Sequence, residues 1–264
     1  MSAPPAGRRR GTWPSAGGGA APNIMIVGDS ISQGREGDYT WRYRFWRNLT
    51  ELGVPARFVG PWAGTWVASA AQPGDAPAHP GDPVHAGRYR RGIAFGGSRH
   101  YASWGRRLRE ARDNIGDAVT AHDAGYLMVA LGFNDLAWGV SAPAGLLADA
   151  ETFITRARDA NPDVQLLFAN VVHRTPLREH PNLARDITSY NRELSFRLAA
   201  MSTARSRTVL VDLGGVYDPY ADAYDGVHPN SVGEIKIALA FERVFSSAFA
   251  YGAAGLATPV PTLL

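Results

Sequence analysis

Short apolar runs alternate with segments of helical periodicity along most of this chain, and that alternation restricts the fold more than any other feature. The runs are typical of buried parallel strands, and they occupy residues 23–27, 57–60, 126–131, 164–169 and 208–212. Helical spacing of apolar residues is found in segments 41–52, 104–119, 146–157, 183–201 and 232–249. Such an order predicts an α/β fold: a three-layer α/β/α sandwich around a five-stranded parallel sheet with right-handed crossovers.

The pattern contains no internal repeat and no linker, which predicts a single domain over residues 23–250. Residues 1–22, rich in Gly, Ala and Pro, are expected to form a disordered tail, and residues 251–264 a second tail. At the start of the last helix, Ser231 and Glu234 have the spacing of a capping box.

Composition excludes several classes of site. The chain has no cysteine, so disulfides, thiolate metal sites and cysteine nucleophiles are absent. The net charge is only +3 and the arginines are scattered, which argues against a nucleic-acid partner. Histidines and aspartates do occur in the long loop 61–95, but their spacing matches no metal-ligand pattern, so neither a metal nor another cofactor is expected; they are Asp75, His79, Asp82 and His85.

The location of the protein is predicted from two features that the sequence lacks. No apolar run approaches the roughly 18 residues that a membrane-spanning helix needs. Arginines at positions 8–10 are followed by no apolar segment of the kind that an export signal contains. We therefore expect a cytoplasmic protein without a membrane span.

Three polar motifs follow predicted strands. Gly28–Ser30 comes after the first strand, Gly132–Asp135 after the third, and Asp225–Pro229 after the fifth. In an open parallel sheet, ligands bind beyond the carboxyl ends of the strands. A hydroxyl, a side-chain amide and a carboxylate–imidazole pair are therefore expected to meet at one edge.

These residue types suit nucleophilic catalysis. A serine hydroxyl such as that of Ser30 needs a base to remove its proton during attack, and the imidazole of His228 can be that base. Asp225, on the same short loop, can accept from the other ring nitrogen and fix the tautomer, while Pro229 restricts the backbone of His228. The side chain of Asn134 and the backbone N–H of Ser30 can donate to an oxyanion.

Each motif alone is also common as a turn or a helix cap. The three together, in this order and each at the exit of a strand, favour catalysis over that structural reading.

The same motifs carry a family likeness. The chain resembles the SGNH, or GDSL-like, hydrolases: Gly28–Ser32 is similar to their first block apart from Ile31, Gly132–Asp135 to their third, and Asp225–Pro229 to their last. The likeness runs from about residue 23 to about residue 245. It implies a flavodoxin-like sheet and the hydrolysis of esters or thioesters through an acyl-enzyme.

The second block of that family supplies a glycine to the oxyanion hole and is the weakest match. His100–Gly105 resembles one form of it, which assigns the role to Gly105. Gly96 and Gly97 are the alternatives.

Further residues after the strands are candidates for substrate contact: Asp29, Trp138, His173 and Arg174. Trp62, Trp66 and Trp138 could hold an acyl chain, a ring or a sugar, and packing within the loops is the alternative. Asp135 is expected to fix local backbone rather than to act as an acid.

The leading hypothesis is thus a metal-independent hydrolase of small-molecule carboxylic esters. An acyltransferase would use the same residues, with an alcohol or amine in place of water and with loop 61–95 as a lid that excludes water. A non-catalytic binding protein on the same fold is the alternative from another class. The identity of the acyl and alcohol groups and the oligomeric state stay open at this point.

Overall fold

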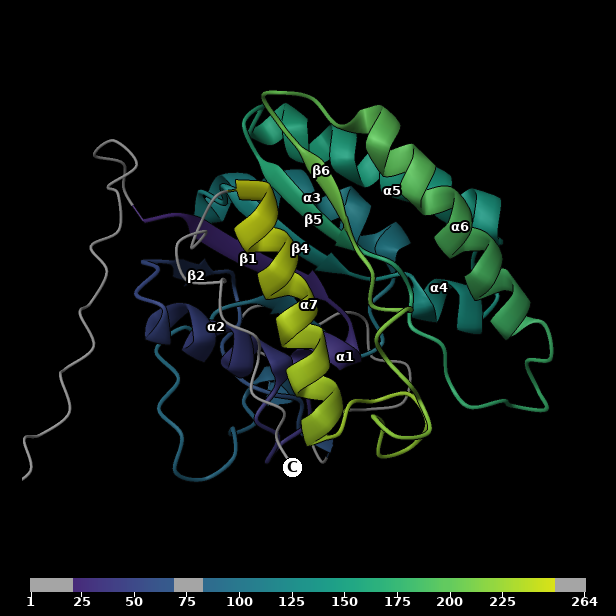
Figure 1. Cartoon of the computed structure of the whole chain (residues 1–264), viewed down its shortest axis with the longest axis horizontal. Helices are drawn as coiled ribbons and strands as arrows, with labels where there is room; N and C mark the ends of the chain where they lie inside the picture. Colours follow the sequence, from purple (N-terminus) through teal and green to yellow (C-terminus); the bar gives the residue numbers. More distant parts are fainter. Residues whose placement is uncertain (1–20, 69–82, 250–264) are drawn as a thin grey trace, which may run out of the picture.

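In the computed structural model, which describes residues 21–68 and 83–249, six parallel strands form one sheet with helices on both faces (Figure 1). The sheet order is β2-β1-β4-β5-β6, and β3 also pairs with β1. The strands are β1 (Asn23–Gly28), β2 (Arg57–Val59), β3 (Tyr101–Ala102), β4 (Tyr126–Ala130), β5 (Gln165–Ala169) and β6 (Thr208–Val211). The predicted three-layer α/β fold and its five strands are confirmed.

Strand β3 was not predicted, because two residues are too short to show a periodic pattern. It pairs with Val27 and Gly28 of β1, whereas β2 pairs with residues 23–25 of the same strand. Thus β3 continues the edge of the sheet beyond β2, towards the residues that follow β1.

Five long helices lie where helical spacing predicted them, and two short ones were not predicted as helices. The helices are α1 (Ser30–Gln33), α2 (Trp41–Glu51), α3 (Leu108–His122), α4 (Phe133–Ala137), α5 (Pro143–Ala160), α6 (Leu183–Met201) and α7 (Ser231–Phe249). The short helices α1 and α4 begin directly after β1 and β4, so they carry the first and third motifs.

The long helices form the two outer layers (Figure 1). Helices α2 and α7 pack against each other, and α5 packs between α3 and α6. The rings of Trp41 on α2 and Phe241 on α7 stack 4.7 Å apart, and both are fully buried. The apolar stripes of these helices are therefore what covers the sheet.

The predicted capping box at the start of α7 is wrong. The side chain of Asn230 accepts from the N–H groups of Val232 and Gly233, so it caps the helix in place of Ser231. The carboxylate of Glu234 instead accepts from the N–H of Thr40, the residue before α2, at 2.7 Å. Glu234 thereby ties the two helices of this layer together.

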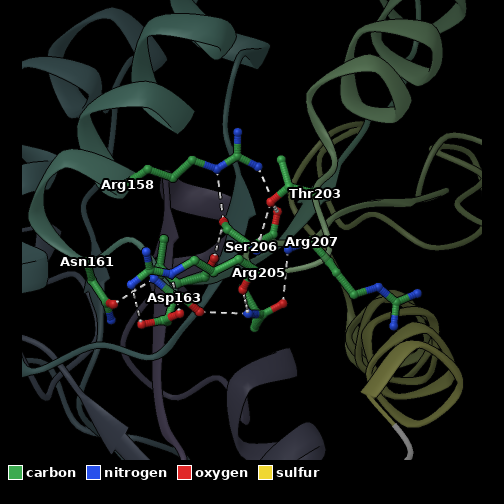
Figure 2. A network of polar contacts seen from close by, with 9 residues as sticks. Arg158, Asn161, Asp163, Thr203, Arg205, Ser206 and Arg207 are labelled. Atoms are coloured by element: carbon green, nitrogen blue, oxygen red, sulfur yellow. Dashed lines mark hydrogen bonds and ion pairs between the residues drawn. The ribbon is translucent and has the colours of Figure 1, made fainter.

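A polar network closes the edge of the sheet where β5 and β6 begin (Figure 2). The guanidinium of Arg158, in the last turn of α5, donates to the hydroxyl and the carbonyl of Ser206. Arg205 pairs with Asp163 in the turn before β5. These turns hold the amino ends of the strands, so the motif residues lie at the opposite edge.

Several predictions fall partly on residues outside the described part of the chain. The predicted tail 251–264 and residues 1–20 of the other tail lie there. So do residues 69–82 of the long loop, with Asp75, His79 and Asp82. The described parts of that loop are paired at Thr65 and Gly87. None of the described helices is long and apolar enough to cross a membrane.

Candidate active site

Ser30, His228 and Asp225 come together at the carboxyl edge of the sheet. Ser30 begins α1, directly after β1, and the other two residues lie on the loop between β6 and α7. The Nε2 atom of His228 lies 2.9 Å from the hydroxyl oxygen of Ser30. Its Nδ1 atom lies 2.7 Å from a carboxylate oxygen of Asp225. The imidazole thus bridges a hydroxyl and a carboxylate, as a general base in a triad must.

Asp225 also organises the backbone of its own loop. Its second carboxylate oxygen accepts from the N–H groups of His228 and Val227, at 2.8 and 3.1 Å. Partial burial alone would raise the pKa of Asp225, but the hydrogen bonds from His228 and Val227 outweigh it and hold the pKa below its usual value. The carboxylate therefore stays ionised beside the ring.

Gly226 lets this loop turn tightly against the segment after β5. Its φ angle is +87°, and a Cβ atom there would lie 2.1 Å from the hydroxyl oxygen of Thr175. The N–H of Thr175 donates to the carbonyl of Gly226 at 3.0 Å. The segment that carries His173 and Arg174 therefore lies beside the loop that carries Asp225 and His228.

Asp29 caps the short helix that presents Ser30. Its carboxylate accepts from the N–H of Ile31 at 2.9 Å, and its side chain is almost completely buried. Burial, reinforced by the nearby carboxylate of Asp135, raises the pKa of Asp29 to about 7. Asp29 therefore fixes the backbone next to Ser30, and its substrate-binding role stays a prediction.

This raised pKa should make stability depend on pH. The folded protein binds the proton of Asp29 more tightly than the unfolded chain does, so the free energy of unfolding should fall as the pH rises from about 4 to about 7. Relative to Asp29→Asn, which cannot titrate, the wild type should lose up to about 4 kcal/mol over that range. Urea denaturation of both proteins at a series of pH values measures the difference.

Asp163→Asn is the matched control for Asp29→Asn. The carboxylate of Asp163 is exposed, and its hydrogen bond with Arg205 lowers its pKa, so any dependence on pH should be small and of opposite sign. A constant difference between Asp29→Asn and the wild type across this range would contradict the prediction.

A buried arginine holds the other end of α1. Arg42 on α2 has no exposed surface, and its guanidinium donates to the carbonyls of Ser32 and Gln33 at 2.6 and 3.1 Å. It also donates to the carbonyl of Ser98 and the hydroxyl of Tyr89. No pattern in the sequence indicates this role, because an arginine on an amphipathic helix is usually at the surface.

Arg42→Lys should lower the free energy of unfolding by about 2–3 kcal/mol, because an ammonium group cannot reach all of these acceptors in the planar geometry of a guanidinium. Arg47→Lys on the same helix is the control, since Arg47 is exposed and its ion pair with Glu51 lies at the surface. Its effect should stay within about 0.5 kcal/mol. Urea denaturation compares the two variants, and equal effects would show that the buried contacts of Arg42 contribute little.

Residues 104–106, which we call the strap, run past α1 and are held at both ends. The N–H of Trp104 donates to the side-chain oxygen of Gln33 at 2.6 Å. The side-chain amide of Asn134 donates to the carbonyl of Arg106 at 3.0 Å. The strap between them contains Gly105, whose φ angle is +74°. The third motif is thus connected through the strap to α1, the helix that begins at Ser30.

The structure distinguishes Gly105 from the two alternative glycines by position. Gly105 lies in the strap, where an added Cβ atom would approach the ring of Trp138 to 3.1 Å. Gly96 and Gly97 lie against the ring of Trp46 on α2. Only Gly105 of the three is thus placed next to residues that contact α1 and Asn134.

The side chain of Asp135 fixes the backbone at the start of α3, not the turn in which Asp135 itself lies. Its carboxylate accepts from the N–H groups of Leu108 and Arg109 at 2.8 and 3.2 Å, at the start of α3. This is why α3 begins at Leu108 and not at Trp104, where the helical spacing begins. Burial raises the pKa of Asp135.

The other predicted contact residues have different environments. Trp138 is 57 % exposed, and Arg174 lines a cavity of about 80 Å³ that continues to His180. Burial lowers the pKa of His173. Trp62 is buried against the ring of His85 at 4.0 Å, so it packs within the loop. In residues 21–68 and 83–249, no group of three acidic or histidine side chains is arranged to hold a metal ion.

Two aromatic neighbours of His228 were not found from the sequence. The ring of Trp104 stacks on the imidazole at 4.5 Å, and that of Tyr224 lies nearly parallel to it at 5.7 Å. Tyr224 belongs to no motif, and Trp104 lies in the block His100–Gly105, which the resemblance connected to the oxyanion hole but not to His228.

Comparison with known proteins adds a family match. The model of the GDSL-like lipase/acylhydrolase family matches residues 26–234, a span that includes all three motifs. No curated protein matches the chain.

Solved structures share the fold at low sequence identity. A crystal structure of an acetyl esterase mutant with acetate ion has 20 % identity and a TM-score of 0.66, covering 87 % of this chain and 98 % of that one. A family 3 carbohydrate esterase from Talaromyces cellulolyticus has 20 % identity and a TM-score of 0.67, with coverage of 87 % and 98 %. The family 3 carbohydrate esterase of Clostridium thermocellum has 20 % identity and a TM-score of 0.63, with coverage of 88 % and 98 %.

Proposed function

Because the chain belongs to the GDSL-like lipase/acylhydrolase family and is therefore a carboxylic-ester hydrolase, we propose that it cleaves its substrate through an acyl-enzyme on Ser30. The observation that carries this proposal is the 2.9 Å contact between the hydroxyl of Ser30 and Nε2 of His228. Asp225 supports it from the other side of the ring, at 2.7 Å.

The reaction has two halves. In the first, His228 takes the proton of Ser30 while the hydroxyl oxygen attacks the acyl carbon, and the imidazolium then protonates the leaving alkoxide. In the second, His228 takes a proton from water, the resulting hydroxide attacks the acyl-enzyme, and the acid leaves as the proton returns to Ser30. Asp225 stabilises the imidazolium in both halves.

Three donors are proposed for the oxyanion: the backbone N–H groups of Ser30 and Gly105 and the side-chain amide of Asn134. An amide nitrogen carries two hydrogens, and the carbonyl of Arg106 takes only one of those of Asn134. The bond to Arg106 orients the amide, and the second hydrogen is then available to substrate. The φ angle of Gly105 is positive, and a residue with a side chain would be strained in that conformation. Glycine therefore allows the peptide groups of the strap to take this direction.

Esters of small molecules are the proposed substrates, and acetylated carbohydrates are the first group to test. Three structural neighbours are an acetyl esterase and two carbohydrate esterases. Trp138 supports this choice because its exposed ring lies beside Gly105 and offers a flat surface to a sugar ring. His173 and Arg174 are proposed to contact the substrate from the segment after β5.

A fluorophosphonate probe tests the covalent step. Only an activated serine attacks such a probe, so the intact mass should increase by one adduct, and peptide mapping should place it on Ser30. His228→Ala should slow the labelling by several orders of magnitude. A correctly folded wild type that takes up no label at Ser30 would refute the mechanism.

A further inference from the structure

The imidazole of His228 lies within a continuous series of stacked side chains. Trp104 stacks on it at 4.5 Å with the ring planes 20° apart, and Trp66 stacks on Trp104 at 4.2 Å. Tyr224 lies 5.7 Å from the imidazole with the planes 18° apart, and the guanidinium of Arg35 lies 3.8 Å from the centre of the Tyr224 ring. The series therefore runs from Trp66 at one end to Arg35 at the other.

The two ends of this series are joined through the backbone. Arg35 and Trp66 face each other in an isolated parallel bridge. The N–H of Trp66 donates to the carbonyl of Gly34 at 2.8 Å, and the N–H of Glu36 donates to the carbonyl of Trp66 at 2.9 Å. The contacts consequently close into a ring, which we call the base clamp: Arg35, Trp66, Trp104, Tyr224 and His228.

Charge is unevenly distributed around the base clamp. Arg35 contributes a cation, and Asp38 binds it: one carboxylate oxygen accepts from the N–H of Arg35 at 2.9 Å, and the other lies 3.4 Å from its Nε atom. The carboxylate of Asp38 is close enough to His228 to be influenced by its charge. Asp225 faces the ring directly. Burial, reinforced by the charge of Asp38, raises the pKa of Glu234 on α7 to about 7.

We propose that Arg35 is a positioning residue for His228: it holds Tyr224 against the imidazole, and its charge opposes protonation of the ring. A cation nearby disfavours the imidazolium, whereas an anion favours it. Arg35 and Asp38 should therefore shift the protonation of His228 in opposite directions. The catalytic consequence rests on the proposed role of His228 as the base, but the effect on protonation does not.

The test is an NMR titration of the His228 ring, which needs no substrate. A spectrum of His228→Gln identifies its signals among those of the seven histidines. In Arg35→Gln the ring should become protonated at a pH higher by roughly half a unit, and in Asp38→Asn at a pH lower by a similar amount. Arg35→Lys keeps the charge and should titrate close to the wild type. Because Arg35 is half exposed, both shifts should shrink in about 1 M salt.

Kinetics then connects the titration to catalysis. The acid limb of the pH profile of kcat/KM reports the protonation of the base in the free enzyme, so it should move with the NMR midpoint in each variant. A purely structural role would lower the rate without moving that limb. Titrations of Arg35→Gln and Asp38→Asn that coincide with the wild type, or shift in the same direction, would overturn the proposal. Failure of fluorophosphonate to label Ser30 would instead overturn the proposed function and leave the shifts intact.

Discussion

Ser30→Ala should lower kcat for an activated ester such as p-nitrophenyl acetate by about 10⁴- to 10⁶-fold. Without the hydroxyl oxygen no acyl-enzyme can form, and His228 retains no group to activate except water. The methyl group of alanine fits in the space of the serine side chain, so the structure of α1 should be unchanged. Steady-state hydrolysis, with circular dichroism to confirm folding, measures the effect.

Ser32→Ala is the matched control, since it removes a buried hydroxyl from the same short helix. The hydroxyl of Ser32 accepts from the indole N–H of Trp41, whereas the hydroxyl that lies against the ring of His228 is that of Ser30. This variant should keep activity within about tenfold of the wild type. If Ser30→Ala retained a tenth of wild-type activity, a nucleophile other than Ser30 would have to be sought.

The motifs of this site were predictable because each lies in the segment between a strand and the long helix that follows it. In a parallel sheet the carboxyl ends of all strands lie at one edge, so the fold itself brings Ser30, Asn134 and His228 together. The order of strands and helices followed from periodicity alone. Five strands and five long helices therefore agree with the structure to within a few residues, apart from the start of α3.

The features that were not predicted depend on contacts between segments far apart in the chain. No periodicity or motif in the sequence marks those contacts. Arg42 belongs to an ordinary amphipathic helix, yet it is buried because α1 ends directly beside it. Tyr224 and Arg35 belong to segments far apart in the chain, and they meet 3.8 Å apart. Glu234 has the spacing of a local cap, but its carboxylate accepts instead from the N–H of Thr40, which lies far away in the chain, just before α2. Local sequence rules cannot find partners so distant in the chain.

Asn134 combines a predictable feature with an unpredictable one. Its motif could be found from the sequence, but its hydrogen-bond partner could not. Asn134 was expected to donate to an oxyanion, but the carbonyl of Arg106 that holds its amide became visible only in the structure. The residue thus has a structural role and a proposed catalytic role. A single substitution removes both, so the experiment on Asn134 needs a control that separates them.

Gln33→Ala supplies this control. Gln33 anchors the opposite end of the strap through the N–H of Trp104, but we assign it no donor to the oxyanion. Its replacement should misplace the strap and cost roughly tenfold in kcat. Both Gln33→Ala and Asn134→Ala leave a buried backbone group without its partner, so each should lower the free energy of unfolding by about 1–3 kcal/mol.

Asn134→Ala should lower kcat by about 10²- to 10³-fold with little change in KM, because a preorganised donor acts mainly where negative charge develops in the transition state. Asn134→Asp should lose at least as much activity: a carboxylate of the same shape brings a negative charge to the oxyanion in place of a donor. Steady-state kinetics of Asn134→Ala, Asn134→Asp and Gln33→Ala on one ester compares the three. If Gln33→Ala loses as much kcat as Asn134→Ala, placement of the strap accounts for the whole effect, and Asn134 does not donate to the oxyanion.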